Sequence, residues 1–306
     1  MQQRRKRVLG LLSAFGVICI WSSFYVISRA GVQTSLTAFD VTALRFMVAS
    51  LLVLPMAWRW WPRHLPWRAT LLMSMCGPGA IYSVLIYLGL SHASAAYGSV
   101  FANGSIPLFT MLMAYLATRE RPRVQQAVAI AVLVTGAVLV GLPGLRAGGG
   151  HVLSGVLLFL SASAILSVYL LGIRQWSLTP RQALALITLP NAALFLPAWY
   201  FWLPTGIAEA SGSAILLQAS FQGLGPGFLA VILFAVATTN LGPTPMAGVA
   251  AAVPASASLL ALVTLGERPV AIEWVGSGVV TLGLVLLFAW RPEPRAPAVV
   301  PARDRG

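Results

Sequence analysis

Charged residues are scarce in this sequence: Asp, Glu, Lys and Arg together make up only 9% of its 306 residues, while 58% are hydrophobic. A soluble domain normally carries about a quarter of its residues as charges. Water therefore cannot be the solvent for most of this surface, and a lipid bilayer is the alternative partner. The formal net charge of +13 does not indicate nucleic-acid binding, because the basic residues form short clusters between apolar runs rather than one basic face.

Reactive and metal-binding residues are also few. The two cysteines, Cys19 and Cys76, lie inside apolar runs without metal-ligand spacing, so we expect neither a metal site nor a cofactor. The sequence has no His-Glu-x-x-His, no Gly-x-Ser-x-Gly and no Gly-rich phosphate loop, which argues against an enzyme and against an ATP-driven pump. The seven acidic residues fall at the ends of apolar runs, between them or in the tail. We therefore expect no buried carboxylate to carry protons.

Ten apolar runs are each close to the roughly 20 residues that a helix needs to cross a bilayer. The first run follows Arg4–Arg7 without a small-residue cleavage site, which predicts a retained span rather than a signal peptide. Residues 291–306 are rich in Pro and Arg and are expected to form a disordered cytoplasmic tail. The predicted spans are 8–28, 37–58, 69–90, 97–117, 124–142, 152–173, 182–203, 221–239, 246–265 and 271–290.

The distribution of basic residues sets the expected orientation. With the amino terminus in the cytoplasm, 16 of the 20 Lys and Arg residues fall on the inner side. Only Arg29, Arg146 and Arg268 fall outside, and Arg45 lies within the second span. This asymmetry follows the positive-inside rule. It predicts a multi-pass protein of the cell inner membrane with both termini in the cytoplasm.

An internal repeat is the most informative pattern in the sequence. A shift of 147 residues brings Pro107, Glu120, Arg121, Pro122 and Gly136 onto Pro254, Glu267, Arg268, Pro269 and Gly283. Each half holds five spans, an odd number, so the second half must cross the membrane in the opposite direction. The sequence therefore predicts an all-α membrane protein of ten transmembrane helices, built as two inverted five-helix repeats over 1–145 and 146–290.

The same residues resemble the drug/metabolite transporter superfamily, in particular its EamA-like branch. The resemblance rests on Trp21-Ser-Ser-Phe24, on Leu44-Arg45-Phe46, and on the doubled pairs Pro107…Glu120 and Pro254…Glu267, each followed by an apolar span with a late Gly. It implies ten helices, two EamA repeats and transport of small metabolites, often efflux of amino acids or related compounds. The Glu-Arg-Pro in both copies departs from the residues that the family often has there.

Several polar and aromatic residues within the spans are candidates for binding a solute. Arg45 is expected either to meet an anionic group in a cavity, or to lie at a helix end and reach outward to the interface or bind carbonyls near Asp40. The aromatic candidates contribute either to a cavity wall or to helix packing. The amides Asn103 and Asn240 need partners or water, and Asn103 is placed to satisfy carbonyls near Pro107. The candidate substrate-binding residues are Trp21, Tyr25, Arg45, Tyr82, Asn103, Tyr169 and Asn240.

Gating is expected where the two halves match. Pro107 and Pro254 remove a backbone donor within spans four and nine, and form either hinges or static bends. Glu120 and Glu267 either form solvated pairs with the adjacent arginines or close a gate on each face. Gly77-Pro-Gly79 and Gly225-Pro-Gly227 correspond at a shift of 148 and are expected near the starts of spans three and eight.

The sequence thus predicts an alternating-access transporter of a small-molecule substrate, which performs efflux or exchange of amino acids or related compounds. Inverted repeats suit this mechanism because exchanging the conformations of the halves converts an outward-open cavity into an inward-open one. An exporter of drug-like or cationic amphiphiles and a non-transporting membrane scaffold remain alternatives. A monomer and a homodimer are both compatible with the sequence.

Overall fold

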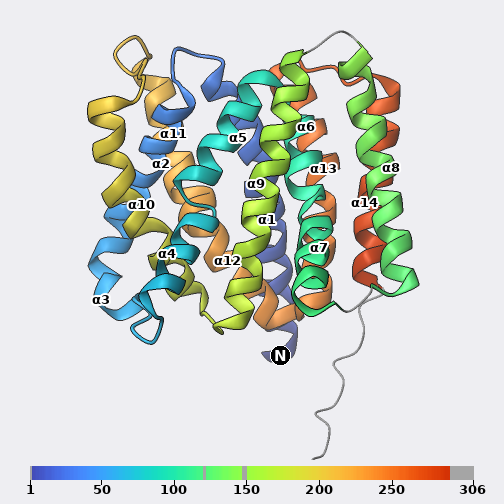
Figure 1. Cartoon of the computed structure of the whole chain (residues 1–306), viewed down its shortest axis with the longest axis horizontal. Coiled ribbons are helices and arrows are strands. Elements are labelled where there is room, and N and C mark those ends of the chain that lie inside the picture. Colours follow the sequence, from blue (N-terminus) through green and yellow to red (C-terminus); the bar gives the residue numbers. More distant parts are fainter. Residues whose placement is uncertain (1, 120–121, 147–149, 290–306) are drawn as a thin grey trace, which may run out of the picture.

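The computed structural model describes residues 2–119, 122–146 and 150–289. Every regular element in these ranges is a helix, and ten stretches are long and apolar enough to cross a membrane. The helices run side by side between the two ends of one bundle (Figure 1). The prediction of an all-α membrane protein with ten spans is confirmed. The division into repeats at 1–145 and 146–290 stays a prediction, and the tail 291–306 lies outside the described residues.

Most spans are single helices. Two spans, the second and the seventh, begin with capping boxes, in which Thr37 pairs with Asp40 and Thr179 pairs with Gln182. The second span continues from α2 (Ala38–Val53) through a 3₁₀ turn (Leu54–Met56) into α3 (Ala57–Trp60). The spans that are single helices are α1 (Gln2–Val32), α8 (Val124–Arg146), α9 (Gly150–Gln175), α10 (Pro180–Trp202), α13 (Pro243–Leu265) and α14 (Ala271–Ala289).

Three further spans, besides span two, change their helical geometry partway across. Span three is α4 (Trp67–Cys76) followed by α5 (Ala80–His92), and span eight is α11 (Gly212–Leu224), a π-helical turn (Gly225–Leu229) and α12 (Ala230–Leu241). Both interruptions fall at the Gly-Pro-Gly sequences, in the middle of the spans Trp67–His92 and Gly212–Leu241. The prediction that they lie near the starts of these spans is therefore wrong. In span eight the helix begins at Gly212, nine residues before the predicted start; in span three Gly77 is already the eleventh residue from Trp67.

Span four is also irregular. It comprises α6 (Ala95–Gly98), a π-helical turn (Ser99–Asn103) and α7 (Ile106–Thr118). Pro107 stands in the first turn of α7, where no intrahelical N–H bond is lost, whereas Pro254 lies inside the continuous α13. The two spans end alike, because Arg119 after α7 and Gly266 after α13 both adopt the left-handed conformation, with φ of 59° and 66°. These two residues are also related by the 147-residue shift.

The contact between α8 and α14 is closely packed and reciprocal. A Cβ added at Gly136 would lie 2.6 Å from the Val280 backbone nitrogen, and one added at Gly283 would lie 2.8 Å from the Leu133 backbone nitrogen. Gly136 and Gly283, and likewise Leu133 and Val280, are the same positions of the two halves under the 147-residue shift. Reciprocal contacts of this kind are the mark of a two-fold axis between equivalent surfaces.

Charges are segregated between the two ends of the bundle. We call the end at which α1 finishes and α2 begins the acidic end, because all four acids that the structure describes lie there. Asp40 and Glu273 are in the first turns of α2 and α14, Glu209 lies between α10 and α11, and Glu267 lies between α13 and α14. The other end, at which α1 begins, we call the basic end. It carries Arg4, Arg5, Lys6 and Arg7 (Figure 1). This segregation agrees with the asymmetry on which the predicted orientation rests.

Candidate functional site

The break in span three brings a kinked backbone to the middle of the bundle. Gly77 and Gly79 are extended, with ψ of −171° and −160°, so the helix stops at Cys76 and restarts at Ala80. A Cβ at Gly79 would lie 2.7 Å from Asn191 Nδ2, and one at Gly77 would clash with Ile187. Only glycine therefore fits against α10 at these two positions. Pro78 between them has no N–H, which leaves a carbonyl free to accept a hydrogen bond.

Asn191 on α10 replaces the hydrogen bonds that this break removes. Its Oδ1 accepts from the Ala80 N–H at 2.7 Å, and its Nδ2 donates to the Ser74 carbonyl at 3.0 Å. A further bond from Nδ2 reaches Ile187 within α10 at 2.8 Å. One buried amide therefore satisfies both halves of span three. Sequence reasoning missed this residue. The available signal was a single amide in an apolar run, directly after Pro190.

Arg45 lies on α2 beside the same break. It is 5% exposed, and its Nη2 donates to the Pro78 carbonyl at 3.4 Å. The guanidinium carbon stands 5.9 Å from the centroids of both the Phe24 and Phe46 rings. Within the described residues Arg45 has no acidic partner, since the one ion pair found there is Arg29–Glu267. Its side chain therefore points into the bundle and does not reach outward to the interface.

Two tyrosines lie near Arg45, and two more lie beside them or over the break. Tyr82 and Tyr87 on α5 are both buried, and the hydroxyl groups of both interact electrostatically with the Arg45 guanidinium. Tyr25 on α1 is buried next to Tyr82. Tyr169 on α9 packs over the break, because a Cβ at Gly77 would lie 2.9 Å from its ring. The structure thus brings together four of the predicted binding residues, Tyr25, Arg45, Tyr82 and Tyr169.

A buried network of amides continues from this cluster toward α1. The Tyr87 hydroxyl donates to Gln222 Oε1 at 3.1 Å, and Gln222 Nε2 donates to Ser28 Oγ at 2.9 Å and to Gln218 Oε1 at 3.1 Å. Gln218 Nε2 then donates to the Ile27 carbonyl at 2.7 Å. Both glutamines come from α11, three and seven residues before the Gly225 break. Sequence reasoning missed them, although their spacing of four residues in an apolar span predicts a shared helix face.

Two buried hydroxyls near this network have no partner among the described residues: Ser22 Oγ on α1 and Ser83 Oγ on α5. Ser83 lies four residues before Tyr87 and so faces the same side of α5. A buried hydroxyl without a hydrogen bond costs about 1–3 kcal/mol. A polar ligand between α1 and α5 would remove this cost.

The other predicted binding residues lie elsewhere. Trp21 stacks on Phe234 of α12, with ring centroids 5.6 Å apart. Asn240 Nδ2 donates to the Val236 carbonyl of its own helix at 2.8 Å. Asn103 is partly buried in the π-helical turn of span four, and no hydrogen bond joins its side chain to another described residue, so the expected bonds to carbonyls near Pro107 are not formed there.

Glu267 forms contacts that close the acidic end. Its Oε1 lies 3.2 Å from Arg29 Nε, and its Oε2 accepts from the Ala95 N–H at 3.0 Å. Arg29 also donates to the Leu90 carbonyl. Glu267 therefore pairs with Arg29 on α1. The solvated-pair alternative expected a pair with its neighbour Arg268. Its counterpart Glu120 lies outside the described residues.

Comparisons with known proteins agree with this architecture. Residues 8–142 match the model of the EamA-like transporter family. An uncharacterized transporter of Bacillus subtilis (strain 168), YwfM, is 26% identical over 263 residues, which cover 83% of this chain and 86% of the relative. A solved crystal structure of a protein aligns with a TM-score of 0.61 at 21% identity, over 92% of this chain and 96% of that one, and shows the same fold.

Proposed function

We propose that the chain is a membrane transporter of the drug/metabolite type, and that it carries small carboxylate-bearing metabolites, amino acids or related compounds, across the cell inner membrane by alternating access. The observation that carries this proposal is the burial of Arg45 without an acidic partner among the described residues. An arginine remains charged at any physiological pH, and a buried charge requires a counter-charge or several hydrogen bonds. The carboxylate of a transported solute supplies both.

The surroundings of Arg45 suit an amino acid or a related solute. The Pro78 carbonyl occupies one guanidinium N–H at 3.4 Å, and the planar fork has further donors for a carboxylate. The free hydroxyl of Ser83 and the tyrosines of the cluster offer hydrogen bonds and stacking surfaces for the rest of the molecule. A site beside interrupted helices near the middle of the membrane is typical of secondary transporters.

Alternating access follows from the repeat and the contacts at the acidic end. The reciprocal packing of α8 and α14 is what two halves related by a two-fold axis would form. The Arg29–Glu267 pair joins the two halves at the acidic end and would have to open for a solute to pass there. We infer that the acidic end faces the outside, because the basic clusters lie at the other end. Both termini are then cytoplasmic.

Efflux or exchange fits this site better than proton-coupled uptake. The four acids that the structure describes lie at the acidic end, and the cluster around Arg45 contains none of them. A proton-driven carrier usually places a carboxylate within the membrane next to its substrate. The matched family and relative are also described as transporters rather than as enzymes.

Counterflow in proteoliposomes tests the proposal. Labelled amino acids and related carboxylates are screened with and without a pH gradient, with Arg45→Gln, Arg45→Lys and, as the matched control, Arg63→Gln. Arg63 is exposed and stacks on Trp58 at the basic end, so its loss should leave exchange unchanged.

We expect saturable exchange without a gradient, abolished by Arg45→Gln and reduced by Arg45→Lys, because lysine keeps the charge but loses the planar fork. Exchange of a cationic amphiphile but of no carboxylate would overturn the assignment and favour the alternative exporter. Absence of any exchange with a properly folded protein would favour a scaffold.

A further inference from the structure

The first turns of α1 project beyond the bundle. Gly10 is the first residue of this helix that is buried, and a Cβ there would lie 2.7 Å from the Leu241 side chain of α12. Residues 3–9 before it are all exposed. At 1.5 Å per residue this exposed segment is about 10 Å long, which is enough to span the headgroup region of one leaflet, about 5–8 Å deep.

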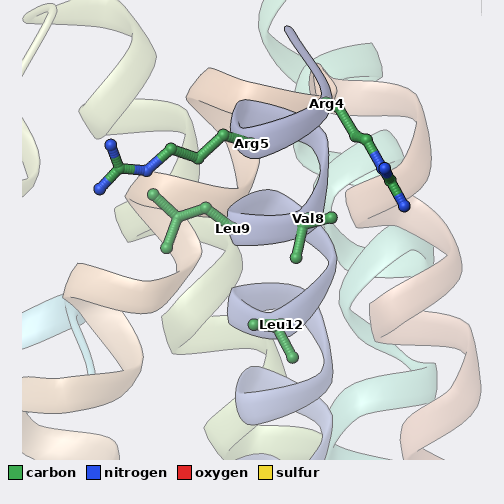
Figure 2. Close-up of a pocket in the computed structure, with 5 residues that line it drawn as sticks. All are labelled: Arg4, Arg5, Val8, Leu9 and Leu12. Carbon is green, nitrogen blue, oxygen red and sulfur yellow. The ribbon is translucent and has the colours of Figure 1, made fainter. Parts of the chain in front are cut away.

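Two arginines and an apolar strip share this segment. Arg4 and Arg5 extend to opposite sides of the helix, with Val8 and Leu9 one turn further along and Leu12 beyond them (Figure 2). Together the five residues line an open cavity of about 550 Å³. Leu12 is 65% exposed, so its side chain meets solvent or lipid rather than protein. The cavity therefore offers a cationic rim and an apolar floor.

Nothing in the described structure neutralises this cationic rim. Helix α1 contains no acidic residue, and the four described acids all lie at the opposite end of the bundle. Lys6 and Arg7 add two more positive charges on the same turns. An uncompensated cationic rim above apolar side chains is complementary to an anionic amphiphile, with a phosphate at the rim and an acyl chain along the floor.

We propose that Arg4 and Arg5, with Val8, Leu9 and Leu12, bind an anionic glycerophospholipid of the leaflet that the basic end faces. The two guanidinium groups, one on each side of the apolar strip, attract the phosphate by their charge, and the apolar side chains hold the first part of an acyl chain. This site is separate from the Arg45 cluster and does not depend on which solute is carried. It fixes the depth of α1, the helix that also carries Tyr25 and Arg29.

Lipid binding to the purified full-length chain in mild detergent tests the proposal, with bound lipids counted by native mass spectrometry. The probes are phosphatidylglycerol and phosphatidylcholine with identical acyl chains, and inorganic phosphate as a soluble competitor. The test variant is Arg4→Gln/Arg5→Gln. Arg59→Gln/Arg63→Gln is the matched control, because it removes the same charge from the same end of the bundle.

We expect phosphatidylglycerol to bind in preference to phosphatidylcholine, and roughly 30-fold more weakly to the test variant than to the native chain. A second variant, Leu9→Gln/Leu12→Gln, keeps every charge and should also weaken lipid binding. Equal losses in the control variant, equal binding of phosphatidylcholine, or displacement of the lipid by millimolar phosphate would each overturn the proposal.

Discussion

Arg29 Nε lies 3.2 Å from Glu267 Oε1, which joins the last turn of α1 to the connection between α13 and α14, 238 residues away in the chain. The second oxygen of Glu267 accepts from the first backbone N–H of α6. One carboxylate therefore holds three spans together at the acidic end. Both side chains are largely buried, with exposures of 19% and 15%, so solvent screens the pair only in part.

Neutralising Glu267 should loosen the acidic end. In Glu267→Gln the charge attraction to Arg29 is lost and the bond to the Ala95 N–H weakens, so we expect faster hydrogen–deuterium exchange in α6 and at the end of α1. The double exchange Arg29→Glu/Glu267→Arg should recover part of the protection. Glu209→Gln, which changes an exposed acid at the same end, is the control. Unchanged exchange in Glu267→Gln would show that this pair does not hold the end closed.

The packing of α8 against α14 requires glycine at two matched positions. In Gly136→Val the new side chain would meet the backbone of α14 around Val280, and we expect a loss of about 1–3 kcal/mol of stability. Gly283→Val should cost a similar amount, because the reciprocal position meets Leu133 of α8. Gly278→Val is the matched control on α14, since a Cβ there meets nothing within 4 Å. Thermal unfolding in detergent measures the three variants.

The ten spans could be predicted because hydropathy averaged over about 20 residues reports contact with lipid, and this depends on composition alone. The position of each break could not be predicted, because it depends on the hydrogen-bonding groups that the neighbouring helix supplies. Gly77-Pro78-Gly79 interrupts the middle of its span only because Asn191 of α10 replaces the missing backbone bonds. The repeat predicted that Gly136 and Gly283 occupy equivalent positions of the two halves. It did not predict that α8 and α14 pack against each other at these glycines.

The same limit applies to the candidate site. Arg45 was identifiable because a charge within a span is rare. The partners of a polar residue are set by tertiary packing, so Gln222 was missed, and the bond of Asn240 within its own helix could not be foreseen. Glu267 was singled out by the repeat, whereas its partner Arg29 is distant in sequence and has no pattern of its own.

Asp40 should be important for stability at the acidic end. This buried carboxylate accepts from Trp199 Nε1 at 2.8 Å, from Thr205 Oγ1 at 2.6 Å and from the Gly206 N–H at 2.9 Å, besides its capping bonds with Thr37. In Asp40→Asn an NH₂ group replaces one carboxylate oxygen and faces the N–H and O–H donors that this oxygen accepted from. We expect the free energy of unfolding to fall by about 2–3 kcal/mol.

Thermal unfolding in detergent again gives the comparison for Asp40→Asn, with Glu209→Gln as the control for loss of a negative charge from the same end. A stability of Asp40→Asn equal to that of the control would mean that the donors around Asp40 find other acceptors.

Asn191→Ala should destabilise the break in span three. The Ala80 N–H and the Ser74 carbonyl would both lose their partner in a buried region, at a cost of about 1–3 kcal/mol for each group left unsatisfied. Asn240→Ala is the matched control, because it removes an amide that bonds only within α12. Hydrogen–deuterium exchange of the Ala80 amide is the direct readout. Equal protection of this amide in both variants would contradict the role assigned to Asn191.

Gln222 should set the position of Tyr87 beside Arg45, and this can be measured as a coupling. Tyr87→Phe and Gln222→Leu each break the same 3.1 Å hydrogen bond, so the double variant should lose less transport activity than the two single losses combined. We expect a coupling energy of about 1 kcal/mol, expressed mainly in the KM for exchange. Gln222→Glu offers an acceptor to Tyr87 but no donor to Ser28, which separates the two bonds of this residue. Its KM should stay nearer to that of the native protein than the KM of Gln222→Leu. Additive losses in the double variant would mean that Gln222 acts on helix packing alone and that Tyr87 meets the solute independently of it.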